Sequence, residues 1–347
     1  MKRLVICYDG TWNNPEDTKQ GEGEAITNVV KMARAIRPKD ADRVEQVVFY
    51  DWGIGTGGFW DALTGGAIGD GIDKNIQDGY RYLVHNFVQG DELFLFGFSR
   101  GAYTARSLVG LVRNCGILKK AHADRIVAAY EEYRSPNRPD TQRAQKFREK
   151  FSREVNVKFL GVWDTVGALG VPFSILKGFN NKKYSFHDVK ISSIVKYAYH
   201  ALAIDERRGA FSPTLWETEE DRKNTAQVWF PGVHSDVGGG YAEAGLSMVA
   251  MDWMVDKAKQ CDLSFDRTYL KSLKTSDSTL HDSWDTMYTS KPRKIGQFTD
   301  ESVHPSAKKR YEMDKDYRPI ELLKHWGLDD EIKKLKEKKF PEDFDEY

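Results

Sequence analysis

The pentapeptide at residues 97–101 (GFSRG) constrains the fold of this chain more than any other stretch, because it places Ser99 between two glycines. The apolar and aromatic run before it, residues 93–96, has the length of a buried parallel strand. Behind it, apolar residues recur at helical spacing until Cys115-Gly116. The sequence therefore predicts a strand that turns sharply into a helix at Ser99, the arrangement of a nucleophile elbow.

Further apolar runs follow the same plan, since each ends in a polar or glycine-rich turn. A helical stripe over residues 72–87 separates the second run from the run before Ser99, which makes a βαβ pattern. We expect a mostly parallel central sheet with helices on both faces, and ligands beyond the carboxyl ends of its strands. The other runs predicted as strands are residues 4–8, 44–50, 157–162 and 226–230.

The length of 347 residues fits one large α/β domain with insertions. We expect the insertions near residues 119–153 and 174–224, with a helix at 194–203 inside the second, and a C-terminal helical tail near 319–347. Within that tail, residues 321–340 read as one lysine-rich surface helix.

Charge and composition exclude several function classes. The 52 basic and 52 acidic residues give a formal net charge of zero, so nothing indicates nucleic-acid binding, and contact with a membrane would need a local patch. No signal peptide or run of about 18 apolar residues is present, so we expect a cytoplasmic protein unless a non-classical route exports it. The three scattered cysteines lack metal-binding spacing, and we expect no metal and no cofactor.

A nucleophilic serine needs a base and an acid that orients the base. The predicted strand 157–162 leads to Asp164, and the strand 226–230 leads to His234. The resulting order of serine, acid and histidine is that of α/β hydrolases. A second assignment stays open, in which Asp236 is the acid and the base comes later in the chain, from His281 or, preferably, His304.

An oxyanion hole takes one N–H from the residue after the nucleophile, here Arg100, and one from an earlier strand-end loop. Gly10 and Thr11, which follow the first predicted strand, are the natural second donors. We expect Asp9 to brace this loop rather than to bind a cation together with Asp236.

Four sequence blocks together carry a family resemblance: DGTWNN at 9–14, GFSRGAYTAR at 97–106, GVWDTVGALG at 161–170 and PGVHSDVGGGY at 231–241. The chain resembles the α/β-hydrolase domain family that includes type VI secretion phospholipase effectors, over about residues 2–310. The resemblance implies an α/β-hydrolase-like fold, a triad of Ser99, Asp164 and His234, and hydrolysis of carboxylic esters. In the toxic members the substrate is a phospholipid acyl chain.

The sequence favours a serine esterase of the lipase or phospholipase kind that works through an acyl-enzyme on Ser99. Its substrate is then a small-molecule or lipid ester. Two alternatives stay open: a non-catalytic binding protein on a hydrolase fold, and a secreted lipase toxin that needs a delivery partner. A long distance from Ser99 Oγ to every imidazole would favour the binding protein. The sequence does not indicate an oligomeric state.

Overall fold

A seven-stranded sheet, parallel throughout, runs through the part of the chain that the structure describes. The structure is a computed structural model that describes residues 1–10, 25–53, 66–136, 138–167, 190–217, 222–286 and 288–339. In spatial order the strands are β2 (Gln46–Asp51), β1 (Arg3–Tyr8), β3 (Glu92–Phe98), β6 (Val157–Trp163), β7 (Val195–Ala203), β8 (Thr225–Phe230) and β9 (Glu301–Val303).

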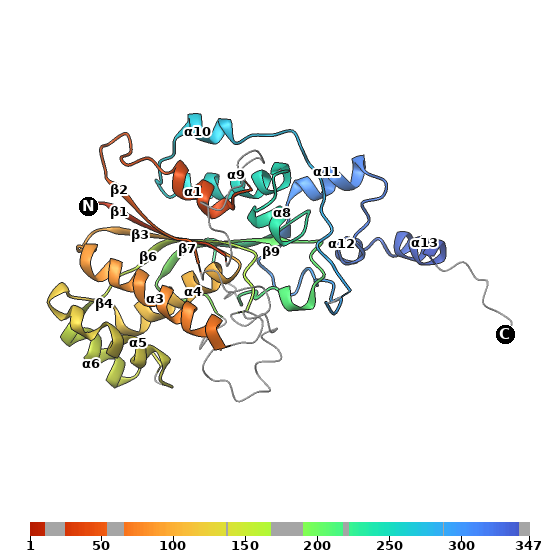
Figure 1. The fold of residues 1–347 in the computed structure, drawn as a ribbon. Helices are drawn as coiled ribbons and strands as arrows, with labels where there is room; N and C mark the ends of the chain where they lie inside the picture. Colours follow the sequence, from red (N-terminus) through yellow and green to blue (C-terminus); the bar gives the residue numbers. More distant parts are fainter. Residues whose placement is uncertain are drawn as a thin grey trace.

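Helices cover both faces of the sheet (Figure 1). On β1, Leu4 and Ile6 belong to one buried apolar cluster and Val5 and Cys7 to another, because successive side chains of a strand point to opposite faces. The predicted α/β architecture is therefore confirmed. One face carries α1 (Asn28–Ala35), α9 (Gly245–Lys259) and α10 (Arg267–Ser272), and the other carries α3 (Gly66–Asn86), α4 (Arg100–Cys115), α5 (Ile126–Arg134) and α6 (Gln142–Phe151).

Shorter elements fill the connections. The predicted insertion at 119–153 contains α5, α6 and a 3-10 helix, η1 (Lys120–Arg125), and a two-residue antiparallel pair, β4 (Ile117–Leu118) with β5 (Ser152–Arg153), closes its ends. Much of the predicted insertion at 174–224 lies outside the described residues. The remaining elements are η2 (Gly209–Phe211), α8 (His234–Gly238), α11 (Pro305–Met313), α12 (Ile320–His325) and α13 (Asp329–Lys339).

Two predicted elements are wrong. The helix expected at 194–203 is the strand β7, which pairs with β6 on one side and β8 on the other. Its valine and its two tyrosines suit a strand, and its three alanines are fully buried because β7 is an inner strand of the sheet. The single C-terminal helix expected at 321–340 is two helices, α12 and α13, because Gly327 adopts a left-handed φ of 70° between them.

The strand order reverses between β1 and β3, since the chain pairs β1 with β2 on one side and with β3 on the other. Ligands of open parallel sheets bind at such a switch point, beyond the carboxyl ends of the strands. A Cβ atom on Gly101 would overlap the carbonyl oxygens of Tyr8 and Asp9, so this glycine lets the end of β1 lie directly against the start of α4. Asp9 and Ser99 therefore come together at the switch point.

Candidate active site

Ser99 lies at the turn from β3 into α4, as the pentapeptide predicts. Its backbone adopts φ 58° and ψ −123°, a region that costs a residue with a side chain of the order of 1–3 kcal/mol. The backbone N–H of Ser99 donates to the carbonyl of Trp163 at 3.0 Å, which ties the turn to the end of β6. A Cβ atom on Gly97 would lie 2.5 Å from the carbonyl oxygen of Gly101, so the sharp turn needs a glycine there.

Ser99, His234 and Asp164 form a continuous chain of hydrogen bonds. His234 Nε2 lies 2.8 Å from Ser99 Oγ, and His234 Nδ1 lies 2.5 Å from Asp164 Oδ2. All three residues are buried, with Ser99 only 6% exposed. These side chains follow three different strands and meet beyond the carboxyl ends of the sheet, where the imidazole can take a proton from the hydroxyl while the carboxylate stabilises the imidazolium.

His234 is the first residue of α8 and is held from several sides. Its backbone N–H donates to Glu206 Oε2 at 3.3 Å. The imidazole packs between two aromatic rings, with centroids 4.6 Å from Phe98 and 5.0 Å from Phe211. Because both ring nitrogens also have partners, the imidazole is fixed in the orientation that joins Ser99 to Asp164.

The electrostatics suit a histidine base. Burial lowers the pKa of His234 below its ordinary 6.5, although the hydrogen bond and the charge of Asp164 act in the opposite direction. Burial alone would raise the pKa of Asp164, but the charge of Arg293 and the hydrogen bond to His234 lower it well below its ordinary value. Near neutral pH the imidazole is therefore neutral and able to accept a proton, while the carboxylate is ionised.

Arg293 is a residue of this site that the sequence analysis missed. Its Nη1 lies 2.5 Å from Asp164 Oδ1 and its Nη2 lies 2.9 Å from Asp164 Oδ2. Arg293 is only 3% exposed and lies in an irregular segment between α10 and β9. Its neighbours in sequence, Pro292 and Lys294, form no motif, so only long-range contact information could have found it.

The structure does not bring Asp236 and His304, the second assignment made from the sequence, together. Asp236 accepts hydrogen bonds from the backbone N–H groups of Val233 and His281, and its Oδ1 lies 2.6 Å from His281 Nδ1. His304 caps the start of α11 through Ser306 and stacks on Phe230. Asp236 thus pairs with His281, the histidine that the sequence ranked lower, and neither of them bonds to Ser99 in the described structure.

The candidate oxyanion donors are only partly described. Arg100 is the first residue of α4, where the N–H groups form the positive end of the helix dipole. The backbone N–H of Gly10 donates to Asp9 Oδ1 at 2.7 Å, so Gly10 is engaged with its neighbour in this structure. Thr11 lies outside the described residues.

The Asp9 carboxylate bonds to three elements around the end of β1. Besides the Gly10 amide it accepts hydrogen bonds from Thr27 Oγ1 at 2.6 Å and from the hydroxyl of Tyr50 at 2.8 Å. Asp9 is buried, and its hydrogen bonds join the ends of β1 and β2 to the start of α1. Among the described residues, no group of three or more His, Cys, Asp or Glu side chains could hold a metal ion.

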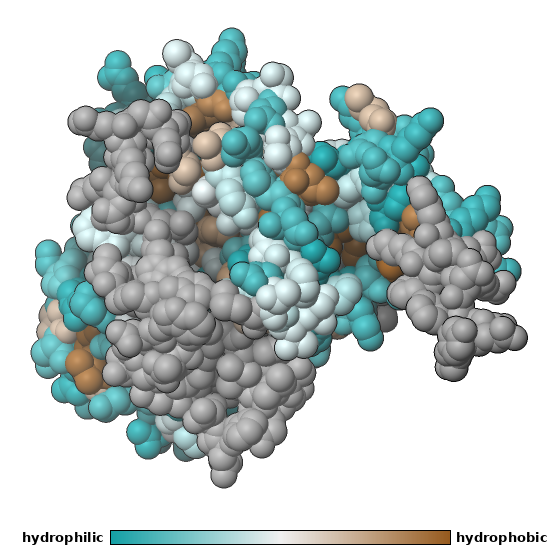
Figure 2. Space-filling view, turned by 45° about the vertical axis from the view of Figure 1, so that its right-hand side comes forward, coloured by the Kyte–Doolittle hydropathy of each residue, from teal (hydrophilic) through white to brown (hydrophobic). Residues whose placement is uncertain are grey.

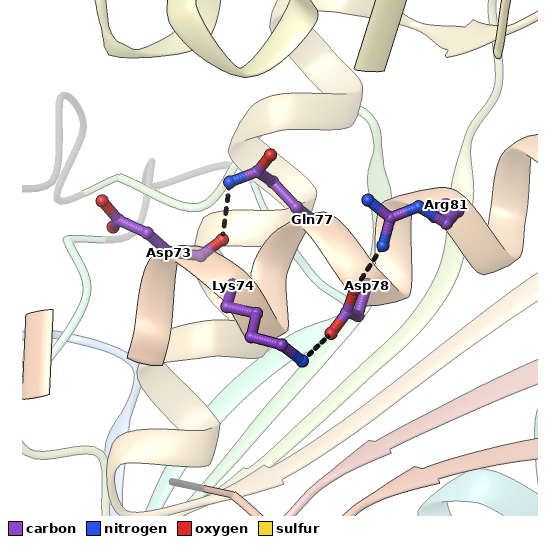
Figure 3. A pocket seen from close by; sticks show the side chains of 5 residues that line it. All are labelled: Asp73, Lys74, Gln77, Asp78 and Arg81. Carbon is purple, nitrogen blue, oxygen red and sulfur yellow. Dashed lines mark hydrogen bonds and ion pairs between the residues drawn. The ribbon is translucent and has the colours of Figure 1, made fainter. Parts of the chain in front are cut away.

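A surface hollow of about 340 Å³ lies over the middle of α3, and none of the triad residues lines it (Figure 3). Its lining side chains pair with each other: Asp78 bonds Lys74 at 2.6 Å and also contacts Arg81. Asp73 accepts a hydrogen bond from Tyr130 of α5 at 2.7 Å. These contacts explain the hollow as a solvated helix face, and we assign no function to it.

Nearly three quarters of the chain, counted from its N-terminus, carry the family assignment. Residues 2–257 match the model of the catalytic domain of Tle1-like phospholipase effectors of type VI secretion systems. The chain belongs to this family. An uncharacterized protein of Saccharomyces cerevisiae, YEL023C, is 30% identical over 235 residues, which cover 60% of this chain and 32% of that protein. The chain thus spans about a third of the length of this curated relative.

Two solved structures are similar to this Tle1-like chain. An uncharacterized protein from Pseudomonas aeruginosa matches with a TM-score of 0.47 and 17% identity, covering 78% of this chain and 47% of that one. A Tle1 effector bound to the VgrG spike of the type VI secretion system matches with a TM-score of 0.39 and 21% identity, covering 69% of this chain and 51% of that one.

The described helices give no candidate for a membrane span, since none is both long and apolar enough. On the face shown in Figure 2, hydrophobic residues form small separate groups among hydrophilic ones. The expected cytoplasmic location stays a prediction.

Proposed function

We propose that this protein is a serine hydrolase of carboxylic esters, of the lipase or phospholipase kind, and that Ser99, His234 and Asp164 are its catalytic triad. One observation carries the proposal: a buried, unbroken hydrogen-bond chain from Ser99 Oγ through the His234 imidazole to the Asp164 carboxylate. Membership in a family of phospholipase effector domains supports a hydrolase of lipid esters.

In the acylation step, His234 Nε2 accepts the proton of Ser99 as Oγ attacks the carbonyl carbon of the ester. Asp164 stabilises the imidazolium that forms, without itself taking the proton. When the tetrahedral intermediate collapses, the bond to the alcohol breaks, and the alcohol leaves with the proton from His234. The acyl group then remains on Ser99 Oγ as an ester.

In the deacylation step, water takes the place of the alcohol. His234 removes a proton from the water, the hydroxide attacks the acyl carbonyl, and Ser99 Oγ leaves and recovers the proton. The negative oxygen of both tetrahedral intermediates lies at the start of α4, where the Arg100 N–H supplies one donor. The Gly10 amide supplies the second donor once it is released from its hydrogen bond to Asp9.

Removing the nucleophile tests the proposal directly. Ser99→Ala is expected to abolish hydrolysis of p-nitrophenyl esters across an acyl-chain-length series, because no other hydroxyl bonds to His234 in the described structure. Covalent labelling by a fluorophosphonate is expected to vanish as well. Rates on the ester series and gel-based labelling of folded protein measure both effects.

Ser107→Ala is the matched control, since Ser107 is a buried serine of the same helix and lies outside the triad. It should hydrolyse and label like the wild type. Equal labelling of the wild type and Ser99→Ala would contradict the proposal and would favour a non-catalytic binding protein.

A further inference from the structure

Arg293 contacts the proposed triad from a part of the chain that follows the matched family region, residues 2–257. Its two terminal nitrogens bond to both oxygens of Asp164, a fork geometry that a planar guanidinium makes and an ammonium does not. With 1% of its side chain exposed, Arg293 places a full positive charge in the interior beside a carboxylate with no exposed surface. Burying such a charge costs several kcal/mol of desolvation free energy, a cost that is about balanced only when the charge is paired and hydrogen-bonded.

The guanidinium also fixes the backbone around the site. Nη1 donates to the carbonyl of Ala203 at 3.1 Å, and Nη2 donates to the carbonyl of Phe211 at 2.7 Å. Ala203 ends β7, and Phe211 packs against the His234 ring. One side chain therefore joins the acid to the strand beside it and to the loop whose aromatic ring orients the base.

The segment that carries Arg293 is anchored where it meets this loop. Gly209 N–H donates to the carbonyl of Thr289 at 2.8 Å, and Lys291 N–H donates to the carbonyl of Arg207 at 2.7 Å. These bonds form a short antiparallel bridge centred on Arg208 and Ser290. Arg293 is thus held two residues beyond a paired segment, which favours a fixed position.

Three charged groups of the described residues act most strongly on His234. Asp164 and Glu206 are the negative groups, Arg293 is the positive one, and Glu206 is itself paired with Arg208 at 2.8 Å. His200, which accepts a hydrogen bond from the Thr165 N–H beside Asp164, is neutral because burial lowers its pKa to about 3. The Asp164 and Arg293 charges cancel, so removing Arg293 leaves a net negative charge next to the imidazole.

We propose that Arg293 is a positioning residue of the triad, which clamps Asp164 in register with His234 and balances its charge from outside the matched phospholipase-like region. This inference rests on the proposed function. Its specific consequence is electrostatic: without Arg293 the His234 and Asp164 pair binds its proton more tightly, and the base becomes active only at higher pH.

The test follows fluorophosphonate labelling of Ser99 from pH 4.5 to 9 in three variants. Arg293→Gln should move the acid limb of the labelling rate upward by about one pH unit or more. Arg293→Lys keeps the positive charge but cannot bond both oxygens of Asp164, so it should lower the plateau labelling rate. Its acid limb should stay within about half a pH unit of the wild type. Arg318→Gln, the control, removes an arginine that bonds three backbone carbonyls in the same C-terminal region, and should leave the limb unchanged.

A second readout separates this inference from the proposed function. The His234 Cε1–H resonance, assigned with His234→Asn, reports the imidazole titration in wild type and Arg293→Gln whether or not any ester is cleaved. An upward move in Arg293→Gln supports the inference, and an unchanged titration overturns it. If the wild type shows no labelling that depends on Ser99, the proposed hydrolase function is contradicted, while the inference about Arg293 is still tested by the titration. If Arg293→Gln does not fold, Arg293→Lys provides the test. A plateau labelling rate equal to that of the wild type in Arg293→Lys would contradict the positioning role of Arg293.

Discussion

At the scale of single residues, the turn from β3 into α4 stores backbone strain at Ser99, the proposed nucleophile. Ser99 has φ 58° and ψ −123°, which glycine adopts without a Cβ penalty. We expect Ser99→Gly and Ser99→Ala to be equally inactive, with Ser99→Gly more stable to unfolding by about 1 kcal/mol. Urea titrations of both variants measure the difference, and a Ser99→Ala protein as stable as Ser99→Gly would speak against strain at this position.

The acid of the proposed triad can be identified by comparing two buried aspartates, Asp164 and Asp236. Asp164→Asn should lower kcat/KM by about 10³-fold or more, because the amide favours the wrong tautomer of His234. Asp236→Asn should keep activity within about tenfold of wild type, since Asp236 bonds His281 and the start of α8 instead. Rates on a single p-nitrophenyl ester are sufficient, and the reverse order of severity would reinstate Asp236 as the acid.

At the scale of elements, three helices meet through one buried amide. Asn28 of α1 donates to the carbonyls of Val237 in α8 and Ser247 in α9, both at 2.9 Å. Asn28→Ala leaves two buried carbonyls without this donor and should cost about 2–3 kcal/mol of unfolding free energy. Because α8 begins with His234, the labelling rate should fall too. Asn86→Ala, at an exposed amide of α3, is the control, and equal melting temperatures would refute the role of Asn28.

The sequence was sufficient for the elements that have a local signal. Alternating apolar runs and turn residues predicted β1, β2, β3, β6 and β8, and the glycines around Ser99 predicted the turn from β3 into α4. β7 was missed because alanine favours helices in isolation, and only pairing with strands on both sides makes this segment a strand. Arg293 was missed for a related reason: 129 residues separate it from Asp164, and nothing near it in sequence marks a site.

At the scale of the whole molecule, stability depends on pH through a carboxyl group that links β7 to the C-terminal region. Asp205 Oδ2 accepts hydrogen bonds from Gly232 N–H at 2.6 Å and from the Tyr317 hydroxyl at 3.0 Å. Burial raises the pKa of Asp205 to about 7. The folded state therefore keeps a proton that the unfolded chain loses near pH 4, so this group's contribution to stability falls as pH rises from about 4 to 7.

Asp205→Asn removes this titration while keeping an oxygen that accepts both hydrogen bonds. Relative to wild type, the variant should gain about 2–3 kcal/mol of unfolding free energy between pH 5 and pH 8. Denaturant unfolding at the two pH values measures the gain. A constant difference between the two proteins would show that Asp205 titrates normally.

The bond between Asp164 and Arg293 has a consequence for how this domain can be recombined. A chimera that joins residues 2–257 to the C-terminal half of another protein would inherit a buried carboxylate without its counter-charge. Such a chimera would keep the proposed triad intact only if the joined segment also placed a cation beside Asp164. The crossover point should therefore lie after Arg293 and not at residue 257, where the family match ends.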